Sequence, residues 1–132
     1  MNALLTYRRL TETDIPTFVA MRITQLKEEG AQSDLDLEPA LTTYYQKHLT
    51  DGTFVSWLAV DGERIIGTSG MSFVEKPPYY SNPTGKIGLL SSMYTHPDYR
   101  RQGIAWKLLD CVVEEARACG CGAVWITASE MG

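Results

Sequence analysis

The last third of the chain most constrains the fold, because it places a helical pattern between two strand-like runs. Residues 87–95 (IGLLSSMYT) are β-prone, and residues 123–128 (AVWITA) are almost continuously apolar. Between them, apolar residues recur at helical spacing from Gly103 onward, and Gly120 is the expected helix stop. This order favours a right-handed crossover between parallel strands. It predicts an α/β or α+β fold with a mixed sheet, in which residues 123–128 are buried on both faces.

The first half of the chain adds a strand and two helices. Residues 4–10 are a short β-prone run. Thr11 followed by Asp14 resembles a helix-capping signal, and apolar residues then keep helical spacing from Ile15 to Gly30. Pro39 marks the start of a second helix.

A hairpin and a long loop follow. Residues 54–60 and 64–74 are β-prone runs around Asp61-Gly62, which suits a tight turn because glycine tolerates positive φ. Residues 75–86 contain three prolines, which predicts a long exposed loop. In residues 87–95 the alternation fails at two doublets, Leu89-Leu90 and Ser91-Ser92, which predicts a bulge.

Composition predicts one soluble globular domain over residues 1–132. The chain is 44% hydrophobic, enough for one core but too short for two domains. Its formal charge is −4 without long blocks of like charge, so neither a nucleic-acid surface nor an anionic membrane is indicated. The amino terminus does not resemble a signal peptide, and no apolar run is long enough to span a membrane. We therefore expect a cytoplasmic protein.

The three cysteines, Cys111, Cys119 and Cys121, are an odd number near one end, which is a poor disulfide framework. We expect reduced thiols. A metal site at Cys119 and Cys121 would need two further ligands, and the two histidines do not provide suitable spacing. We predict no metal.

Two arginines stand directly before the helix at Gly103, in the stretch YRRQGIAWKLLD. The first turn of a helix leaves N–H groups unpaired and carries a partial positive charge. Gly103 lets a ligand approach the backbone, and Arg100 and Arg101 add charge. The stretch is either a phosphate or pyrophosphate site or a solvated basic turn. It matches neither the dinucleotide-binding nor the Walker motif.

Residues 100–105 (RRQGIA) fit the signature [Q/R]-x-x-G-x-[G/A], and here the chain resembles the GNAT superfamily of N-acetyltransferases. The likeness extends through MYTHPDYRRQGIAWKLL and ITASEMG, and the order of elements agrees over essentially the whole chain. The resemblance implies a GNAT-like acyl-CoA N-acyltransferase fold. It also implies transfer of acetyl from acetyl-CoA to a primary amine of a small molecule or peptide by direct attack. The alternative is a non-catalytic acyl-CoA-binding or interaction module that retains the cofactor site.

The resemblance also implies roles for individual residues. Met93 and Thr95 would pair their backbones with pantetheine, and the Met93 amide would donate to the thioester oxygen. Arg100 would add charge beside the pyrophosphate. The N–H groups that would bind this pyrophosphate belong to Arg101, Gln102, Gly103, Ile104 and Ala105.

Candidates for handling the amine's proton are few. Glu75 ends a hairpin strand and is either the carboxylate that faces the cleft or a solvated loop residue. Ser91 or Ser92 would order a water, whereas His96, before Pro97, has an expected structural role. Tyr79 and Tyr80 would line a substrate pocket or pack over the hairpin.

The chain departs from the family after residue 128. GNAT proteins normally continue past the position of Gly132 with a helix that bears a tyrosine and then two strands, whereas this sequence ends at SEMG. It is therefore expected to be C-terminally truncated, either as a fragment or with a second copy supplying the missing edge in a homodimer. Asp34, Asp36 and Glu38 suit a cationic acceptor, or are ordinary solubilising residues.

Overall fold

The structure is a computed structural model that describes residues 5–31 and 34–126. The helices within these residues are α1 (Ile15–Glu28), α2 (Glu38–Asp51) and α3 (Ile104–Ala118), with 3-10 turns η1 (Glu12–Asp14) and η2 (Pro97–Tyr99). The strands are β1 (Leu5–Arg9), β2 (Phe54–Val55), β3 (Trp57–Asp61), β4 (Arg64–Glu75), β5 (Lys86–Thr95) and β6 (Ala123–Ile126).

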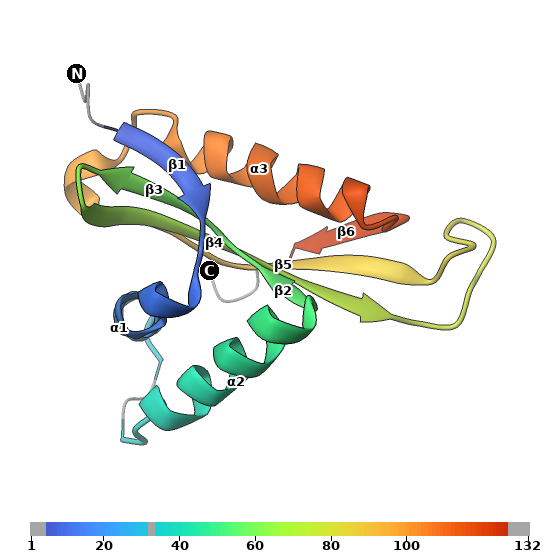
Figure 1. The fold of residues 1–132 in the computed structure, drawn as a ribbon, viewed down its shortest axis with the longest axis horizontal. Helices are drawn as coiled ribbons and strands as arrows, with labels where there is room; N and C mark the ends of the chain where they lie inside the picture. Colours follow the sequence, from blue (N-terminus) through green and yellow to red (C-terminus); the bar gives the residue numbers. More distant parts are fainter. Residues whose placement is uncertain (1–4, 32–33, 127–132) are drawn as a thin grey trace.

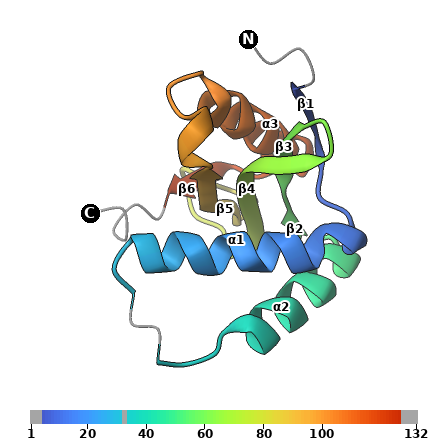
Figure 2. The ribbon, with the colours of Figure 1, turned by 90° about the vertical axis from the view of Figure 1, so that its left-hand side faces the viewer.

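The described strands form one mixed sheet between two helical layers. Its order is β1-β3-β4-β5-β6, with β2 also pairing with β4. All pairs are antiparallel except β5 with β6. Helices α1 and α2 cover one face and α3 lies against the other (Figures 1 and 2). The mixed α/β sheet and the parallel pair predicted around α3 are therefore confirmed.

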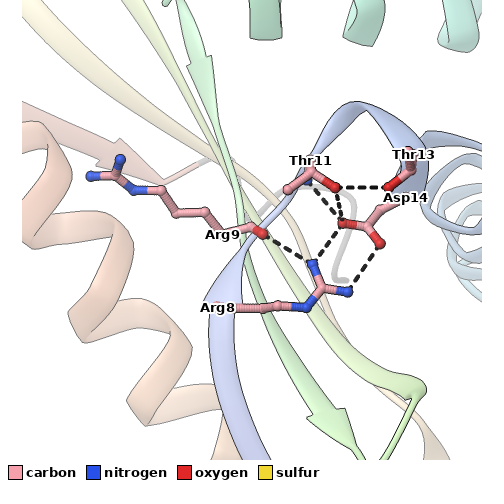
Figure 3. Close-up of polar contacts among 5 residues, drawn as sticks. All are labelled: Arg8, Arg9, Thr11, Thr13 and Asp14. Carbon is pink, nitrogen blue, oxygen red and sulfur yellow. Dashed lines mark hydrogen bonds and ion pairs between the residues drawn. The ribbon is translucent and has the colours of Figure 1, made fainter.

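The capping signal at Thr11 and Asp14 is confirmed (Figure 3). The Asp14 carboxylate accepts hydrogen bonds from the Thr11 N–H and hydroxyl, each at 2.9 Å. Arg8 donates to its two oxygens at 2.7 and 3.0 Å. The hydrogen bond from Arg8 is the largest influence on this carboxyl and lowers its pKa to about 2.

The predicted hairpin is present, with a break in its first strand. Asp61 pairs with Arg64 around Gly62, whose φ is +64°. The run at residues 54–60 divides at Ser56 into β2 and β3. Next to this break, the Ser69 hydroxyl bonds both the N–H and the carbonyl of Trp57, at 3.1 and 2.9 Å. A side chain thus replaces part of the ladder at this point.

The loop after β4 is shorter and less exposed than predicted. Glu75 and Lys86 still pair in the sheet, so the connection comprises residues 76–85. Within it Asn82 is 1% exposed, because its side chain donates to the Lys86 carbonyl at 2.9 Å and accepts from Thr84 at 2.9 Å. The loop predicted for residues 75–86 is thus confirmed over residues 76–85 and is exposed except at Asn82 and Gly85, whose burial the sequence does not reveal.

Helix α3 is amphipathic, as predicted, and begins and ends at glycines. Gly103 is its N-cap with φ +79°, and Gly120, with φ +80°, follows its last turn. One residue in four is buried along a single face, against β3, β4 and β5. These residues are Ile104, Leu108, Val112 and Ala116.

Strand β6 is not buried on both faces. Val124, Trp125 and Ile126 are 36%, 42% and 63% exposed. The described part of β6 pairs only with β5 and lies at the edge of the sheet, so that no described strand shields its far side. The prediction of burial was therefore wrong for residues 123–126, and residues 127 and 128 lie outside the described residues.

The cysteines carry free thiols. Burial raises the pKa of Cys111 and of Cys121. Among residues 5–31 and 34–126, no group of three or more histidine, cysteine or acidic side chains is arranged to hold a metal ion. Across the same residues, no helix has both the length and the apolar character needed to cross a membrane.

Candidate active site

The start of α3 brings no side-chain cap of its own. Gly103 occupies the N-cap position, and the first turn contains no acidic residue. A Cβ built on Gly103 would meet nothing within 4 Å, so the backbone is open to solvent on that side. First-turn N–H groups and the helix dipole favour an anion at such a position.

The turn before α3 is shaped by two residues with positive φ. Arg101 has φ +67° and Gly103 has φ +79°. When residues with left-handed and right-handed backbone conformations alternate, successive N–H groups point into one concave site. Such sites bind anions. A non-glycine residue in this region costs roughly 1–2 kcal/mol, and the sequence did not predict this strain at Arg101.

The two arginines of the turn have different environments. Arg100 donates from Nε to the Thr95 carbonyl at 2.8 Å, and its Nη2 lies 3.4 Å from a Glu28 carboxylate oxygen. Its guanidinium is also 5.5 Å from the centre of the Tyr94 ring. Arg101 is exposed, and within the part of the chain that the structure describes its side chain has no hydrogen bond or ion pair. Arg100 therefore braces the turn, and Arg101 supplies the accessible charge.

A cavity of about 400 Å³ lies against this turn. Most of the residues predicted to bind a cofactor line it, together with the 73% exposed Trp106. The lining residues are Thr95, Tyr99, Arg100, Arg101, Gly103, Ile104, Ala105 and Trp106. Gln102 is in the turn but does not line the cavity, and Met93 lies further back along β5.

The predicted bulge in β5 is confirmed. Gly70 of β4 pairs with Ser91, and Thr68 pairs with Tyr94, so Ser92 and Met93 fall outside the paired positions. Ser92 has φ +60° and is 5% exposed. The Thr68 hydroxyl donates to the Ser92 carbonyl at 2.9 Å.

Backbone carbonyls along this stretch accept from side chains of the protein itself. Gln25 on α1 donates from Nε2 to the Met93 carbonyl at 2.9 Å, and Arg100 binds the Thr95 carbonyl. Helix α1 runs beneath the strands and so reaches β5 from the face opposite α3 (Figure 2). While these contacts hold, strand-like pairing of a ligand with Met93 and Thr95 would use their N–H groups.

The comparison with protein families is decisive. The sequence profile described as acetyltransferase (GNAT) family matches residues 19–131. The chain belongs to the GNAT family. No curated protein matches it.

A solved GNAT relative has the same fold at moderate identity. It is a predicted acetyltransferase with acetyl-CoA from Clostridium acetobutylicum, 35% identical, with a TM-score of 0.92 over 97% of this chain and 83% of that chain.

Two further structures agree in fold alone. One is a GCN5-related N-acetyltransferase from Ralstonia eutropha JMP134, 24% identical, with a TM-score of 0.86 over 97% of this chain and 86% of that one. The other is an aminoglycoside acetyltransferase from an uncultured soil metagenomic sample, in complex with sisomicin. It is 21% identical, with a TM-score of 0.71 over 97% of this chain and 80% of that one.

In this GNAT chain the predicted proton-handling residues lie apart. Ser91 is beside the bulge, opposite Gly70. Glu75 pairs with Lys86, five residues further along β4, or roughly 17 Å away at about 3.3 Å per residue. Figure 1 shows that this end of the hairpin projects beyond the rest of the sheet. The structure thus brings Ser91, but not Glu75, close to Met93.

His96 and the loop tyrosines have contacts away from the bulge. His96 Nδ1 accepts from the Asp98 N–H at 3.2 Å, and its Nε2 lies 2.9 Å from Arg64 Nη2. Tyr79 and Tyr80 stand on the projecting loop, where Tyr80 is fully exposed. These contacts fit the structural role expected of His96.

Sequence reasoning missed Gln25 on α1, which contacts Met93, and Glu29, the residue that follows α1. Gln25 is 4% exposed, and its Nε2 also lies 3.2 Å from a Glu29 carboxylate oxygen. Glu29 therefore stands within two hydrogen bonds of the Met93 carbonyl. Helical spacing places Gln25 and Glu29 on one face, but a polar pair in a surface helix carries no sequence signal that it faces a sheet.

Proposed function

We propose that this GNAT protein transfers the acetyl group of acetyl-CoA to a primary amine of a small molecule or peptide. The single observation that carries the proposal is the start of α3, where an uncapped helix terminus, a positive-φ turn and Arg101 meet at one cavity. The acetyl-CoA in the structure of the 35% identical relative supports the choice of cofactor.

The residues of this turn fit the pyrophosphate of the cofactor. Backbone N–H groups of residues 101–105 would bind it, since no acidic side chain competes in the first turn and no Cβ fills the space at Gly103. Arg101 would add charge, while Arg100 would hold the turn against β5. The N–H groups of Met93 and Thr95 would bind the pantetheine arm.

Bound acetyl-CoA would supply a thioester that an unprotonated amine attacks directly. The Met93 N–H would donate to the thioester oxygen as negative charge develops there. A preorganised donor of this kind lowers a barrier by about 3–4 kcal/mol. Ser91, beside the bulge, would order a water near the reacting atoms.

The acceptor must lose a proton, because an alkyl amine is mostly ammonium at neutral pH. Glu29 is better placed than Glu75 to take it, since Gln25 links its carboxylate to the Met93 carbonyl. Replacing Glu29 with Gln should slow transfer at neutral pH and slow it less at high pH, where the amine is already neutral. Glu114→Gln on α3 is the matched control, because among the described residues Glu114 pairs only with Arg117, and both side chains are exposed. An equal rate for Glu29→Gln and the wild type would remove Glu29 from this role.

One cavity supports a cationic acceptor, and one sheet edge supports pairing with a second copy of the chain. A cavity of about 370 Å³ after α1 is lined by Asp34, Asp36 and Lys27 among apolar residues, which suits a cationic amine. The exposed edge at β6 supports pairing with a second copy, which light scattering would test.

The first experiment measures the melting temperature with and without acetyl-CoA, then CoA release with a panel of spermidine, sisomicin and a lysine peptide. A saturable rise in melting temperature with CoA release supports the proposal. A rise without release from any amine favours the acyl-CoA-binding module. No rise in a chain that melts cooperatively contradicts the cofactor site itself.

A further inference from the structure

Two buried polar side chains hold the bulge of β5. Thr68 is 3% exposed and Gln25 is 4% exposed. Burying a hydroxyl or carboxamide is costly unless it is hydrogen-bonded. Each group donates to a backbone carbonyl at 2.9 Å, Thr68 to Ser92 and Gln25 to Met93. These two carbonyls belong to the two peptide groups that flank the Met93 Cα.

The contact from Thr68 sets the direction of the Met93 N–H. A trans peptide is planar, with its C=O and N–H pointing in opposite directions. The Ser92 carbonyl points at the Thr68 hydroxyl on β4, so the N–H of Met93, in the same peptide, points away from β4. On the other side of β5, the described pairs with β6 end at Leu90. The Met93 N–H therefore faces the side of β5 on which β6 lies, three residues beyond the last described pair.

The contact from Gln25 fixes the next peptide. Arg22 donates to Gln25 Oε1 at 3.1 Å, so the carboxamide must turn its Nε2 toward Met93. The paired positions of the β4–β5 ladder skip Ser92 and Met93, so the ladder alone does not hold these two peptides.

We propose that Thr68 and Gln25 are positioning residues that aim the Met93 N–H at the thioester oxygen. This inference rests on the function proposed above and adds the groups that fix its oxyanion donor. Neither side chain needs to touch the acetyl group. Thr68 acts through the Ser92 carbonyl, and Gln25 acts through the carbonyl of Met93 itself.

The experiment is isotope-edited infrared spectroscopy of the full chain with acetyl-CoA labelled with ¹³C at the thioester carbonyl. In the wild type, the carbonyl stretch of bound acetyl-CoA should lie below that of free acetyl-CoA, because the Met93 N–H polarises it. Thr68→Val keeps the shape of the side chain but removes its donor, so the stretch should return toward the free value. Thr68→Ser keeps the hydroxyl and should restore the wild-type stretch.

Gln25→Met is the second variant, and it should shift the stretch in the same direction even where Thr68→Val folds poorly. The control is Thr50→Val, which removes a hydroxyl that donates to the Gln46 carbonyl on the exposed side of α2. Both site variants should keep the rise in melting temperature with acetyl-CoA, because the turn at Gly103 is intact.

If the carbonyl stretching frequency of bound acetyl-CoA in both Thr68→Val and Gln25→Met equals that in the wild type, the inference is overturned. It is also overturned if, in the wild type, this frequency is the same for bound and free acetyl-CoA. In these cases a retained rise in melting temperature leaves the cofactor site standing. Absence of the rise in the wild type instead overturns the proposed function and this inference with it.

Discussion

The starts of η1 and α3 differ in how their backbone N–H groups are capped. At Thr11 the Asp14 carboxylate, which Arg8 holds in place, accepts from the Thr11 N–H and hydroxyl (Figure 3). At Gly103 the chain offers no side-chain cap and no acidic residue, and it adds an accessible arginine. A helix start with its own carboxylate is complete, whereas one without it is available to an external anion.

The difference shows how few residues separate a helix start that is capped by its own side chains from one that is not. Both segments come a few residues after a strand, and both lie beside an arginine. Asp14 is 13% exposed in its side chain and neutralises its arginine, whereas Arg101 has no described partner. The position of one carboxylate therefore distinguishes a turn that neutralises its own arginine from one that leaves its arginine accessible.

The largest expected effect comes from giving the Gly103 turn a carboxylate of its own. Gly103→Asp should abolish the stabilisation by acetyl-CoA, which for the wild type is about 2.7 kcal/mol at 100 times the dissociation constant. The measurement is the melting temperature with and without acetyl-CoA. Gly120→Asp is the control, because Gly120 has nearly the same φ and the same free space at the other end of α3. Equal losses in both variants would show that backbone strain, not the anion site, is responsible.

The next largest effect is expected from removing the Asp14 carboxylate, which caps η1. Asp14→Ala loses the cap of η1 and the partner of Arg8, so the free energy of unfolding should fall by about 1–2 kcal/mol. The stabilisation by acetyl-CoA should be unchanged. Denaturant melts of Asp14→Ala and of the exposed control Asp110→Ala measure the difference. A loss no larger than in Asp110→Ala would mean that Asp14 is not an effective cap.

The stability that the ionised Asp14 carboxylate contributes should depend on pH. Because Arg8 lowers the Asp14 pKa in the folded chain from 3.8 to about 2, the ionised carboxylate contributes stability above about pH 4. That contribution should be lost as the pH falls from about 4 through 2. The gap in unfolding free energy between the wild type and Asp14→Asn should therefore be constant near neutrality and narrow in acid. A gap that widens in acid would contradict the sign of this shift.

The smallest expected effect concerns the accessible charge of the Gly103 turn. Arg101→Gln should weaken acetyl-CoA binding only a few-fold, since an exposed charge contributes about 0.3–1 kcal/mol. It should also reduce the dependence of the dissociation constant on salt. Calorimetry at two ionic strengths measures both changes. Arg117→Gln, at the far end of α3, should bind acetyl-CoA like the wild type, and the same weakening there would indicate only an effect of net charge.

Local patterns predicted much of the fold. Asp61-Gly62 predicted the hairpin turn, Thr11 with Asp14 the first cap, and Gly103 with Gly120 the bounds of α3. The doublets Leu89-Leu90 and Ser91-Ser92 predicted a bulge, which lies at Ser92 and Met93. Each of these features depends on interactions among residues a few positions apart, so the sequence alone contains the information. Likewise, the uncapped, basic start of α3 can be recognised without coordinates.

Other features were decided by contacts between distant parts of the chain. Thr68 and Ser92 are 24 residues apart, and Gln25 and Met93 are 68 apart. No local pattern distinguishes Gln25 from an ordinary surface glutamine, or shows that Glu75 lies far from the bulge and that β6 is exposed. The sequence by itself determined most of the elements, their order and the uncapped, basic start of α3, because short-range geometry governs them. Only the tertiary structure decided which side chains hold Met93, because packing of α1 and β4 around β5 brings them together.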